Sequence, residues 1–169
     1  CEMVDIDQDG FLDLLVGGQN TYSNLRGFVD SNRIYWGNGK SFDVERSLAL
    51  PELTHWDLTL DFGCIDLNQD GQKELILLRT GDSSGNGTQF YMGYYIQILA
   101  GNKNQFQDVT SSFFKENYSL SGRNIPNILV GDINQNGLID IVNPDKGSSY
   151  GSPNNKNPSM MWEMGIDGK

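Results

Sequence analysis

Carboxylate and amide side chains alternate through three short stretches of the sequence, and one glycine follows each alternation. The stretches read DIDQDGFLD (loop one, residues 5–13), DLNQDGQKE (loop two, residues 66–74) and DINQNGLID (loop three, residues 132–140). Oxygen atoms at positions one, three and five of a tight loop can converge on one point, and glycine at position six permits the sharp turn. A main-chain carbonyl at position seven and a carboxylate at position nine can close the shell. Such a set of hard oxygen ligands suits Ca²⁺ better than Mg²⁺, so the sequence predicts up to three calcium sites.

The predicted ligands occupy the same five positions in every loop. They are Asp5, Asp7, Asp9, the Phe11 carbonyl and Asp13 in loop one; Asp66, Asn68, Asp70, the Gln72 carbonyl and Glu74 in loop two; and Asp132, Asn134, Asn136, the Leu138 carbonyl and Asp140 in loop three. Calcium affinity rises with the number of carboxylates, so we expect it to decrease from loop one to loop three. The alternative is that these are ordinary solvated Asp/Asn/Gly turns, and this alternative is strongest for loop three.

The sequence excludes an EF-hand, which needs a bidentate glutamate at position twelve and a helix on either side. Position twelve is occupied by Val16, Leu77 and Asn143. Short apolar runs follow the loops at residues 11–18, 73–81 and 138–143. Runs of this length and composition predict buried strands, so each loop is expected to connect two strands of a hairpin.

The rest of each repeat predicts further strands. Third strands are expected at residues 32–42, 94–106 and 159–169, fourth strands at 42–50 and 106–114, and first strands at 58–66 and 127–133. Trp36 and Trp162 fall within third strands and are expected in the core. Four antiparallel strands in each repeat of about 63 residues make one propeller blade. The predicted fold is therefore all-β, a partial β-propeller of about three four-stranded blades.

The predicted blades span residues 1–50, 51–114 and 115–169. The first is expected to be incomplete at its N-terminus and the third to lack its outer strand, so the three together are interpreted as a fragment of one larger propeller. Closed propellers usually have four to eight blades. We therefore expect the remaining blades, or another chain, to complete the fold.

The charge of the chain limits its partners. The net charge is −10 over 169 residues, and the three loops hold nine of the 22 acidic side chains. Nucleic acid and anionic membrane surfaces are poor partners for such a protein. No apolar run approaches the length of a membrane span, which predicts no membrane insertion. The two cysteines, Cys1 and Cys64, are interpreted as buried free thiols in preference to a disulfide.

The loops of the type DIDQDGFLDLLVG and the strand link GNKNQFQDVT resemble the FG-GAP/VCBS repeat family, which includes the propellers of integrin α-subunits and many secreted bacterial proteins. The resemblance extends over nearly the whole chain. It implies calcium in the hairpin between the first and second strand of each blade, held by the residues named above. Two positions depart from the family pattern: Glu74 stands where aspartate is usual, and Asn136 replaces an aspartate.

The sequence offers no catalytic constellation. His55 is the only histidine, no Ser/His/Asp or Cys/His set accompanies it, and no zinc spacing or phosphate loop is present. Binding is the better prediction, because long loops opposite the calcium end carry aromatic side chains that can stack on sugars or anchor a protein. These candidate ligand-binding residues are Tyr22, His55, Trp56, Phe90, Tyr91, Tyr118 and Tyr150. The alternative is that these aromatic side chains cover blade edges.

We therefore expect a non-catalytic, calcium-stabilised module for adhesion or for binding a protein or glycan. It is expected to be extracellular, at the cell surface or periplasmic. Two alternatives remain open: a non-catalytic part of a secreted polysaccharide-active enzyme, and a structural spacer.

Overall fold

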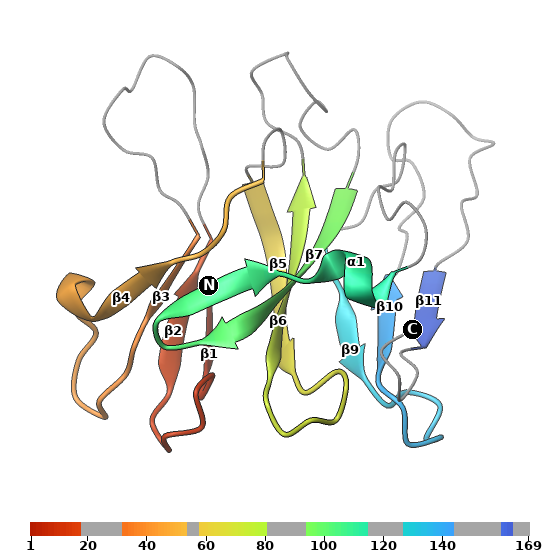
Figure 1. Ribbon diagram of the computed structural model, residues 1–169, viewed down its shortest axis with the longest axis horizontal. Helices are drawn as coiled ribbons and strands as arrows, with labels where there is room; N and C mark the ends of the chain where they lie inside the picture. Colours follow the sequence, from red (N-terminus) through yellow and green to blue (C-terminus); the bar gives the residue numbers. More distant parts are fainter. Residues whose placement is uncertain (18–31, 54–57, 81–93, 115–126, 144–159, 164–169) are drawn as a thin grey trace, which may run out of the picture.

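Antiparallel β-sheet accounts for most of the regular structure. The computed structural model describes residues 1–17, 32–53, 58–80, 94–114, 127–143 and 160–163. In these residues the strands form three sheets that stand side by side (Figure 1). Each sheet is built from one continuous stretch of the sequence. The all-β prediction is confirmed.

The strands follow one another across each sheet in chain order. The first sheet contains β1 (Glu2–Val4), β2 (Asp13–Val16), β3 (Arg33–Tyr35) and β4 (Ser47–Ala49). The second contains β5 (Leu58–Ile65), β6 (Glu74–Thr80), β7 (Tyr94–Asn102) and β8 (Gln105–Asp108). The third contains β9 (Leu129–Gly131), β10 (Asp140–Asn143) and β11 (Met160–Glu163), with β10 in the centre. All the strand pairs are antiparallel.

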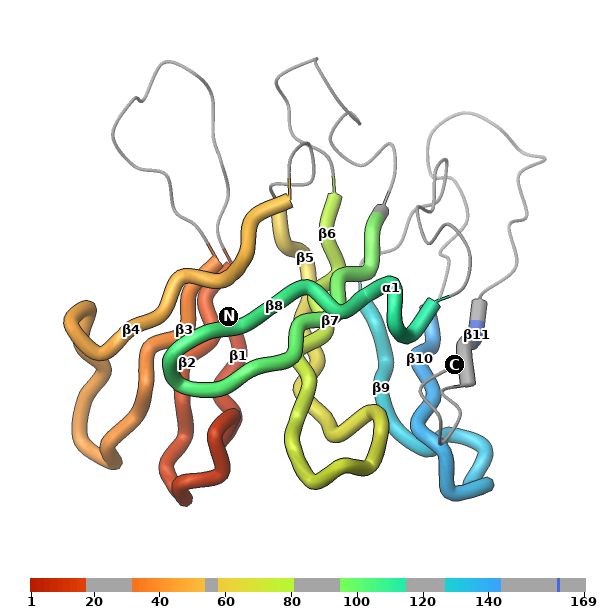
Figure 2. The backbone as a smooth tube through the Cα atoms, in the orientation of Figure 1, coloured from red at the N-terminus to blue at the C-terminus, as the bar shows by residue number. Residues whose placement is uncertain are grey.

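Each predicted loop joins the first and second strands of its sheet. Loop one connects β1 to β2, loop two connects β5 to β6, and loop three connects β9 to β10. All three loops lie at the same end of the row of sheets (Figure 2). β2, β6 and β10 therefore run away from this end, and each ends at the opposite one.

Two apolar layers hold the three sheets together. The layer between the first and second sheets includes Leu15, Ile34, Leu75 and Leu99. The layer between the second and third sheets includes Ile76, Ile98, Phe113 and Ile141. Successive residues of β6 face opposite layers, because side chains alternate along a strand, and every residue of β6 is buried.

The predicted fourth strands are partly wrong. In residues 42–50 a short 3₁₀ turn, η1 (Val44–Arg46), precedes β4. In residues 106–114 strand structure ends at Asp108, and a helical turn, α1 (Thr110–Phe113), follows.

The local cause of both departures is an aspartate at the start of the turn. The Asp43 carboxylate accepts a hydrogen bond from the Glu45 amide at 3.0 Å, and Asp108 accepts one from the Thr110 amide at 3.0 Å. Such side-chain bonds favour a turn over a continuing strand. The turn of α1 also brings Phe113 and Phe114 into the second apolar layer.

The core and cysteine predictions have mixed outcomes. Trp36 is buried in the first apolar layer, as predicted, whereas the Trp162 side chain lies outside the part that the structure describes. Cys1 and Cys64 are both free thiols, but Cys1 is exposed, so the expectation that both are buried is wrong for Cys1. Cys1 precedes β1, an edge strand of the first sheet, whereas Cys64 lies in β5 and packs against the first apolar layer.

Candidate metal centre

The three loops share one backbone conformation. The glutamines at position four, Gln8, Gln69 and Gln135, have φ of 61°, 60° and 61°. The glycines at position six, Gly10, Gly71 and Gly137, have φ of 91°, 90° and 88°. A φ near 90° is a conformation that glycine adopts without steric cost, which explains why glycine occupies position six in each loop.

The same five hydrogen bonds form inside every loop. In loop one the Asp9 amide donates to Asp5 Oδ1 and to Asp7 Oδ1, both at 3.1 Å, and the Gly10 amide donates to Asp5 Oδ2 at 3.0 Å. The Phe11 amide donates to Asp9 Oδ1, and the Ile6 amide donates to Asp13 Oδ2. The equivalent five bonds occur in loop two and in loop three. The acidic and amide side chains thus fix the turn from inside, with their oxygens directed toward the loop interior.

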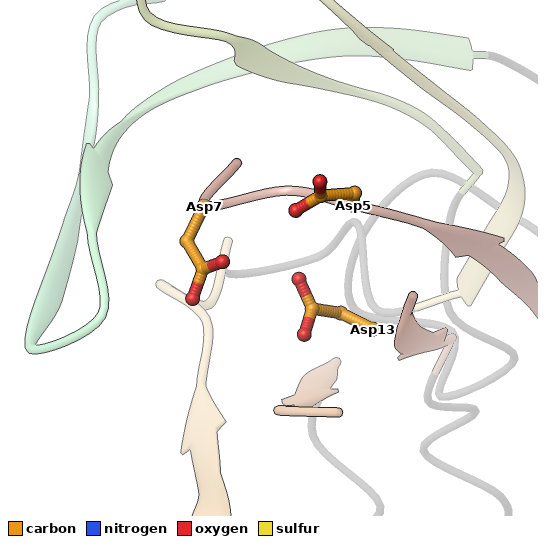
Figure 3. Close-up of side chains that lie close together, drawn as sticks. All are labelled: Asp5, Asp7 and Asp13. Carbon is orange, nitrogen blue, oxygen red and sulfur yellow. The ribbon is translucent and has the colours of Figure 1, made fainter. Parts of the chain in front are cut away.

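Three carboxylates converge in loop one. Asp5, Asp7 and Asp13 each offer an oxygen atom within 4.8 Å of the others (Figure 3). Among the described residues, no other trio of His, Cys, Asp or Glu side chains brings its ligand atoms this close. Asp13 is fully buried and also accepts a hydrogen bond from the Gly37 amide at 2.8 Å. Burial raises the pKa of Asp13, although the amide donors of Gly37 and Ile6 partly offset this effect.

Lysine side chains from the second sheet supply positive charge to loop one. The Lys103 ammonium, in the turn between β7 and β8, forms ion pairs with Asp7 Oδ2 and with Asp9 Oδ2, the latter at 2.8 Å. Lys73 donates a hydrogen bond to the Asp5 carbonyl at 2.8 Å. Repulsion among the loop-one carboxylates is therefore partly balanced from a neighbouring sheet.

Loops two and three carry fewer carboxylates, and loop three is more open. Asp66 and Asn68 are half-buried, whereas Asp132, Asn134 and Asn136 are exposed. At position nine Glu74 and Asp140 are buried like Asp13. Burial raises the pKa of Glu74, and Asp70 and Asp66 raise it further against the opposing amide of Leu67.

The donor set of loop one fits a hard divalent cation. Asp7 Oδ2 is buried, and the Lys103 ammonium forms an ion pair with it. A buried anionic oxygen is costly unless a cation lies beside it, so the place that Lys103 occupies is one where a bound metal ion would also be stabilised. In loop three Asp140 Oδ1 is likewise buried, and it has no hydrogen-bond partner in the described part of the chain. Carboxylates on a tight oxygen-lined turn are ligands that Ca²⁺ prefers.

The other predicted site residues divide into two groups. Asp9 and Asp70, at position five, are exposed, as are the position-seven residues Phe11 and Gln72, while Leu138 is half-buried. The candidate ligand-binding residues Tyr22, His55, Trp56, Phe90, Tyr91, Tyr118 and Tyr150 all lie outside the described residues.

Sequence reasoning missed the glutamine at position four. The Gln8 side chain donates a hydrogen bond to the Gly71 carbonyl at 2.9 Å, and the Gln69 side chain donates one to the Gly137 carbonyl at 2.6 Å. Loop one is thereby joined to the tip of loop two, and loop two to the tip of loop three. The signal was present in the sequence, since glutamine occupies this position in all three copies.

A comparison with protein families matches part of the chain to the FG-GAP-like repeat, over the stretch that begins at Asp5 and ends at Leu77. Residues 5–77, the stretch that matches this repeat, are called the FG-GAP-like repeat segment below. This segment contains loops one and two complete, together with β2 to β5 and the first half of β6. The resemblance predicted from the loop motifs is confirmed there, and loop three lies beyond the matched segment.

No curated protein and no solved structure matches the chain. The function is therefore argued from the similarity of residues 5–77 to the FG-GAP-like repeat. Among the described residues no helix could cross a membrane, and α1 has only four residues.

Proposed function

We propose that this chain is a non-catalytic, calcium-stabilised β-propeller module that presents a binding surface for a protein or glycan outside the cell. The observation that carries the proposal is the convergence of Asp5, Asp7 and Asp13 in a loop whose backbone recurs in loops two and three. Two observations support a propeller: the match of residues 5–77 to the FG-GAP-like repeat, and the packing of the three sheets through two apolar layers, as neighbouring blades pack.

The proposed role of calcium is to stabilise the hairpins. The cation would be held by Asp5, Asp7, Asp9, Asp13 and the Phe11 carbonyl in loop one, and by the equivalent residues in loops two and three. A bound cation would neutralise the repulsion between Asp13, at the start of β2, and the carboxylates of Asp5 and Asp7, which follow β1. It would thereby hold the two strands of the hairpin together. Extracellular calcium sites often have dissociation constants near ~0.1 mM, at which ~2 mM calcium would add about 1.8 kcal/mol of stability for each site.

Calorimetric titration with calcium, together with melting curves in calcium and in EDTA, tests this role. We expect calcium to raise the melting temperature of the wild-type protein, and Asp7→Asn to reduce that rise because it removes one converging carboxylate. Glu52→Gln is the matched control, since Glu52 is exposed and lies outside the loops. Equal melting temperatures in calcium and EDTA would contradict the proposal.

The proposed ligand surface lies at the end opposite the calcium loops. β2, β6 and β10 end there (Figure 1), and the segments that carry Tyr22, Phe90, Tyr91 and Tyr150 follow those strands in the sequence. Aromatic side chains among Asn, Ser and Gly suit stacking on sugars combined with adaptable hydrogen bonds. Calcium then acts on binding indirectly, through the strands that present these segments.

A glycan array and a pull-down of extracellular proteins, followed by single substitutions, test the ligand surface. Trp56→Ala, Tyr91→Ala or Tyr150→Ala is expected to weaken binding with little change in melting temperature. Asp7→Asn is expected to lower the melting temperature while leaving binding at saturating ligand almost unchanged. Contacts that map to loops one and two, with the metal bridging to the ligand, would refute this arrangement.

A further inference from the structure

Three asparagines of the chain are followed directly by glycine: Asn38, Asn86 and Asn136. An asparagine in this setting is open to deamidation, because glycine has no side chain to shield its own amide nitrogen from the neighbouring carboxamide. Asn136 occupies position five of loop three, where loops one and two carry Asp9 and Asp70. Asn86 lies outside the described residues, so the structure allows Asn38 and Asn136 to be compared.

Deamidation at Asn136 needs water as its only co-reactant. The main-chain nitrogen of Gly137 forms a bond to Cγ of Asn136 and gives up its proton to solvent. The bond from Cγ to the side-chain nitrogen breaks, and that nitrogen takes up a proton and leaves as ammonia. Water then hydrolyses the resulting cyclic succinimide at either of its carbonyls. One product is aspartate, and the other is isoaspartate, in which the former side-chain carbons continue the main chain.

Loop three exposes both reacting groups to water. Asn136 and Gly137 are exposed. A Cβ added to Gly137 would have no heavy atom of a non-adjacent described residue within 4 Å, so the backbone can move there without displacing a neighbour. Asn136 Oδ1 accepts a hydrogen bond from the Leu138 amide at 2.9 Å. Donation to this oxygen stabilises the negative charge that develops on it during attack at Cγ.

The turn that contains Asn38 is more closely packed. Asn38 is half-buried, and its Oδ1 accepts hydrogen bonds from the amides of Lys40 and Ser41 at 2.8 and 2.9 Å. A Cβ on Gly39 would lie 2.8 Å from Phe11 Cε1, so the Phe11 ring covers one side of this glycine. Movement of the Gly39 nitrogen toward the Asn38 side chain must therefore separate the glycine from the ring.

A hydrogen bond restrains the attacking nitrogen in the closed form of loop three. The Gly137 amide donates to Asp132 Oδ2 at 2.8 Å, so the loop must open locally before the nitrogen can attack. Positions three and five of loop three are amides, Asn134 and Asn136, whereas loop one has carboxylates at both positions. Hydrogen bonds to carboxylates are the stronger kind. Loop three should therefore open at a lower free-energy cost than loop one.

We infer that Asn136 is a site of spontaneous modification: when loop three opens, the Asn136 side chain deamidates and position five gains a carboxylate. The release of the Gly137 amide from Asp132 sets the rate. The aspartate product raises the number of loop-three carboxylates from two, Asp132 and Asp140, to three, the number in loop two. The isoaspartate product lengthens the main chain inside the turn and so disrupts the hydrogen bonds of the loop.

The two products have opposite consequences for the proposed calcium site, and this consequence alone rests on the proposed function. A third carboxylate strengthens calcium binding at loop three, because affinity rises with the number of carboxylates. The lengthened turn of the isoaspartate product moves the position-five oxygen away from the other ligands. Deamidation would therefore divide the protein into a population with a stronger third site and a population that has lost it.

Peptide mass spectrometry of protein incubated in mildly alkaline buffer with EDTA measures the reaction, because deamidation replaces an amide NH₂ by OH and changes the peptide mass. We expect Asn136 to react at least about fivefold faster than Asn38 in the folded protein, since opening the Asn38 turn also removes the contact with Phe11. In protein unfolded by denaturant the two asparagines should react at similar rates. The Asn136→Asp variant supplies the reference peptide for the aspartate product, from which isoaspartate separates by chromatography.

The Asp132→Asn variant tests whether loop three controls the rate. It should speed deamidation of Asn136 about fivefold, because a neutral amide holds the Gly137 amide less firmly than a carboxylate does. The rate at Asn38, which lies in the first sheet, should stay unchanged and serves as the internal control for unfolding. The inference is overturned if Asn136 reacts no faster than Asn38 in the folded protein. It is also overturned if Asp132→Asn leaves the Asn136 rate unchanged or raises it only together with the Asn38 rate. None of these measurements involves calcium, so a failure of the proposed metal role is a separate result.

Discussion

Lys103 sets the charge balance of loop one from a distance of 94 residues in the sequence. Its ammonium pairs with Asp7 and Asp9, two of the proposed calcium ligands, so a cation entering the loop must compete with it. The side chain of Lys103 is 49% exposed, and exposed ion pairs contribute modestly to stability. We therefore expect Lys103 to lower the calcium affinity of loop one without preventing calcium from binding there.

Lys103→Met is expected to tighten calcium binding at loop one by about two- to fivefold, because the competing ammonium is removed. Calorimetric titration measures the change, and Lys40→Met, at an exposed turn position of the first sheet, is the control. Weaker calcium binding in Lys103→Met would show that the ammonium assists the cation.

The buried carboxyls at position nine make the effect of calcium depend on pH. Burial raises the folded-state pKa values of Asp13 and Glu74 above their ordinary 3.8 and 4.5. In the metal-free protein these groups stabilise the fold below the ordinary values, and this contribution is lost as pH rises through the raised values. Calcium needs the ionised form. The calcium-induced rise in melting temperature should therefore shrink as pH falls from neutral toward the raised pKa values of Asp13 and Glu74, and a rise independent of pH would contradict this.

The two thiols should differ in reactivity. Burial raises the pKa of Cys64 to about 12, with the nearby Lys73 only partly opposing the effect, whereas Cys1 is exposed. Thiolates are the reactive form of cysteine. At about pH 8 a thiol reagent should therefore label Cys1 rapidly and Cys64 only after unfolding, which mass spectrometry of the labelled peptides would detect. Equal labelling rates in the folded protein would refute the packing of Cys64.

At the level of the elements, a glycine near the end of each of the first two third strands, β3 and β7, lies very close to a neighbouring stretch of backbone. A Cβ on Gly37 would lie 2.0 Å from the Leu12 carbonyl oxygen, and one on Gly101 would lie 2.1 Å from the Gln105 carbonyl oxygen. The Gly37 amide also donates the bond to Asp13 Oδ1. Gly37, just after β3, is thus joined to loop one by a hydrogen bond and by close backbone contact.

Gly37→Ala is expected to lower the free energy of unfolding by about 2 kcal/mol or more, since backbone atoms must move to admit the methyl group. Ser41→Ala, at an exposed position of the same turn, is the control. Denaturant unfolding measures both, and similar stabilities for the two variants would show that the turn relaxes without cost.

Sequence patterns predicted some elements closely and others poorly. The predicted strands at residues 58–66 and 73–81 agree with β5 and β6, because apolar residues fill them and turn residues bound them. The predicted strand at residues 106–114 ends at Asp108, because the Thr110 amide donates a hydrogen bond to the Asp108 carboxylate and this local bond outweighs strand propensity. The three loops could be predicted from the spacing of their acidic, amide and glycine residues alone, because each loop is one tight turn formed by residues that are neighbours in the sequence. Contacts such as Gln8 with Gly71 depend on how the sheets stack, and spacing along the sequence does not reveal that.

At the level of the whole molecule, the second sheet has neighbours on both faces. The buried residues of β6 alternate between the two apolar layers, and β5 and β7 pair with it on either side. The first and third sheets each have one such neighbour among the described residues. Stability should therefore be greatest in the middle of the row.

The double burial of β6 has a consequence for amide hydrogen exchange. Its main-chain amides are paired within the sheet and shielded by side chains above and below, so no local opening frees them without separating two layers. The amides of Leu75 to Leu78 should exchange only through global unfolding, at rates that report the full stability of the protein. Those of β1, at the edge of the first sheet, should exchange by fraying. Mass spectrometry of deuterated peptides would measure this gradient, and uniform protection across the three sheets would contradict it.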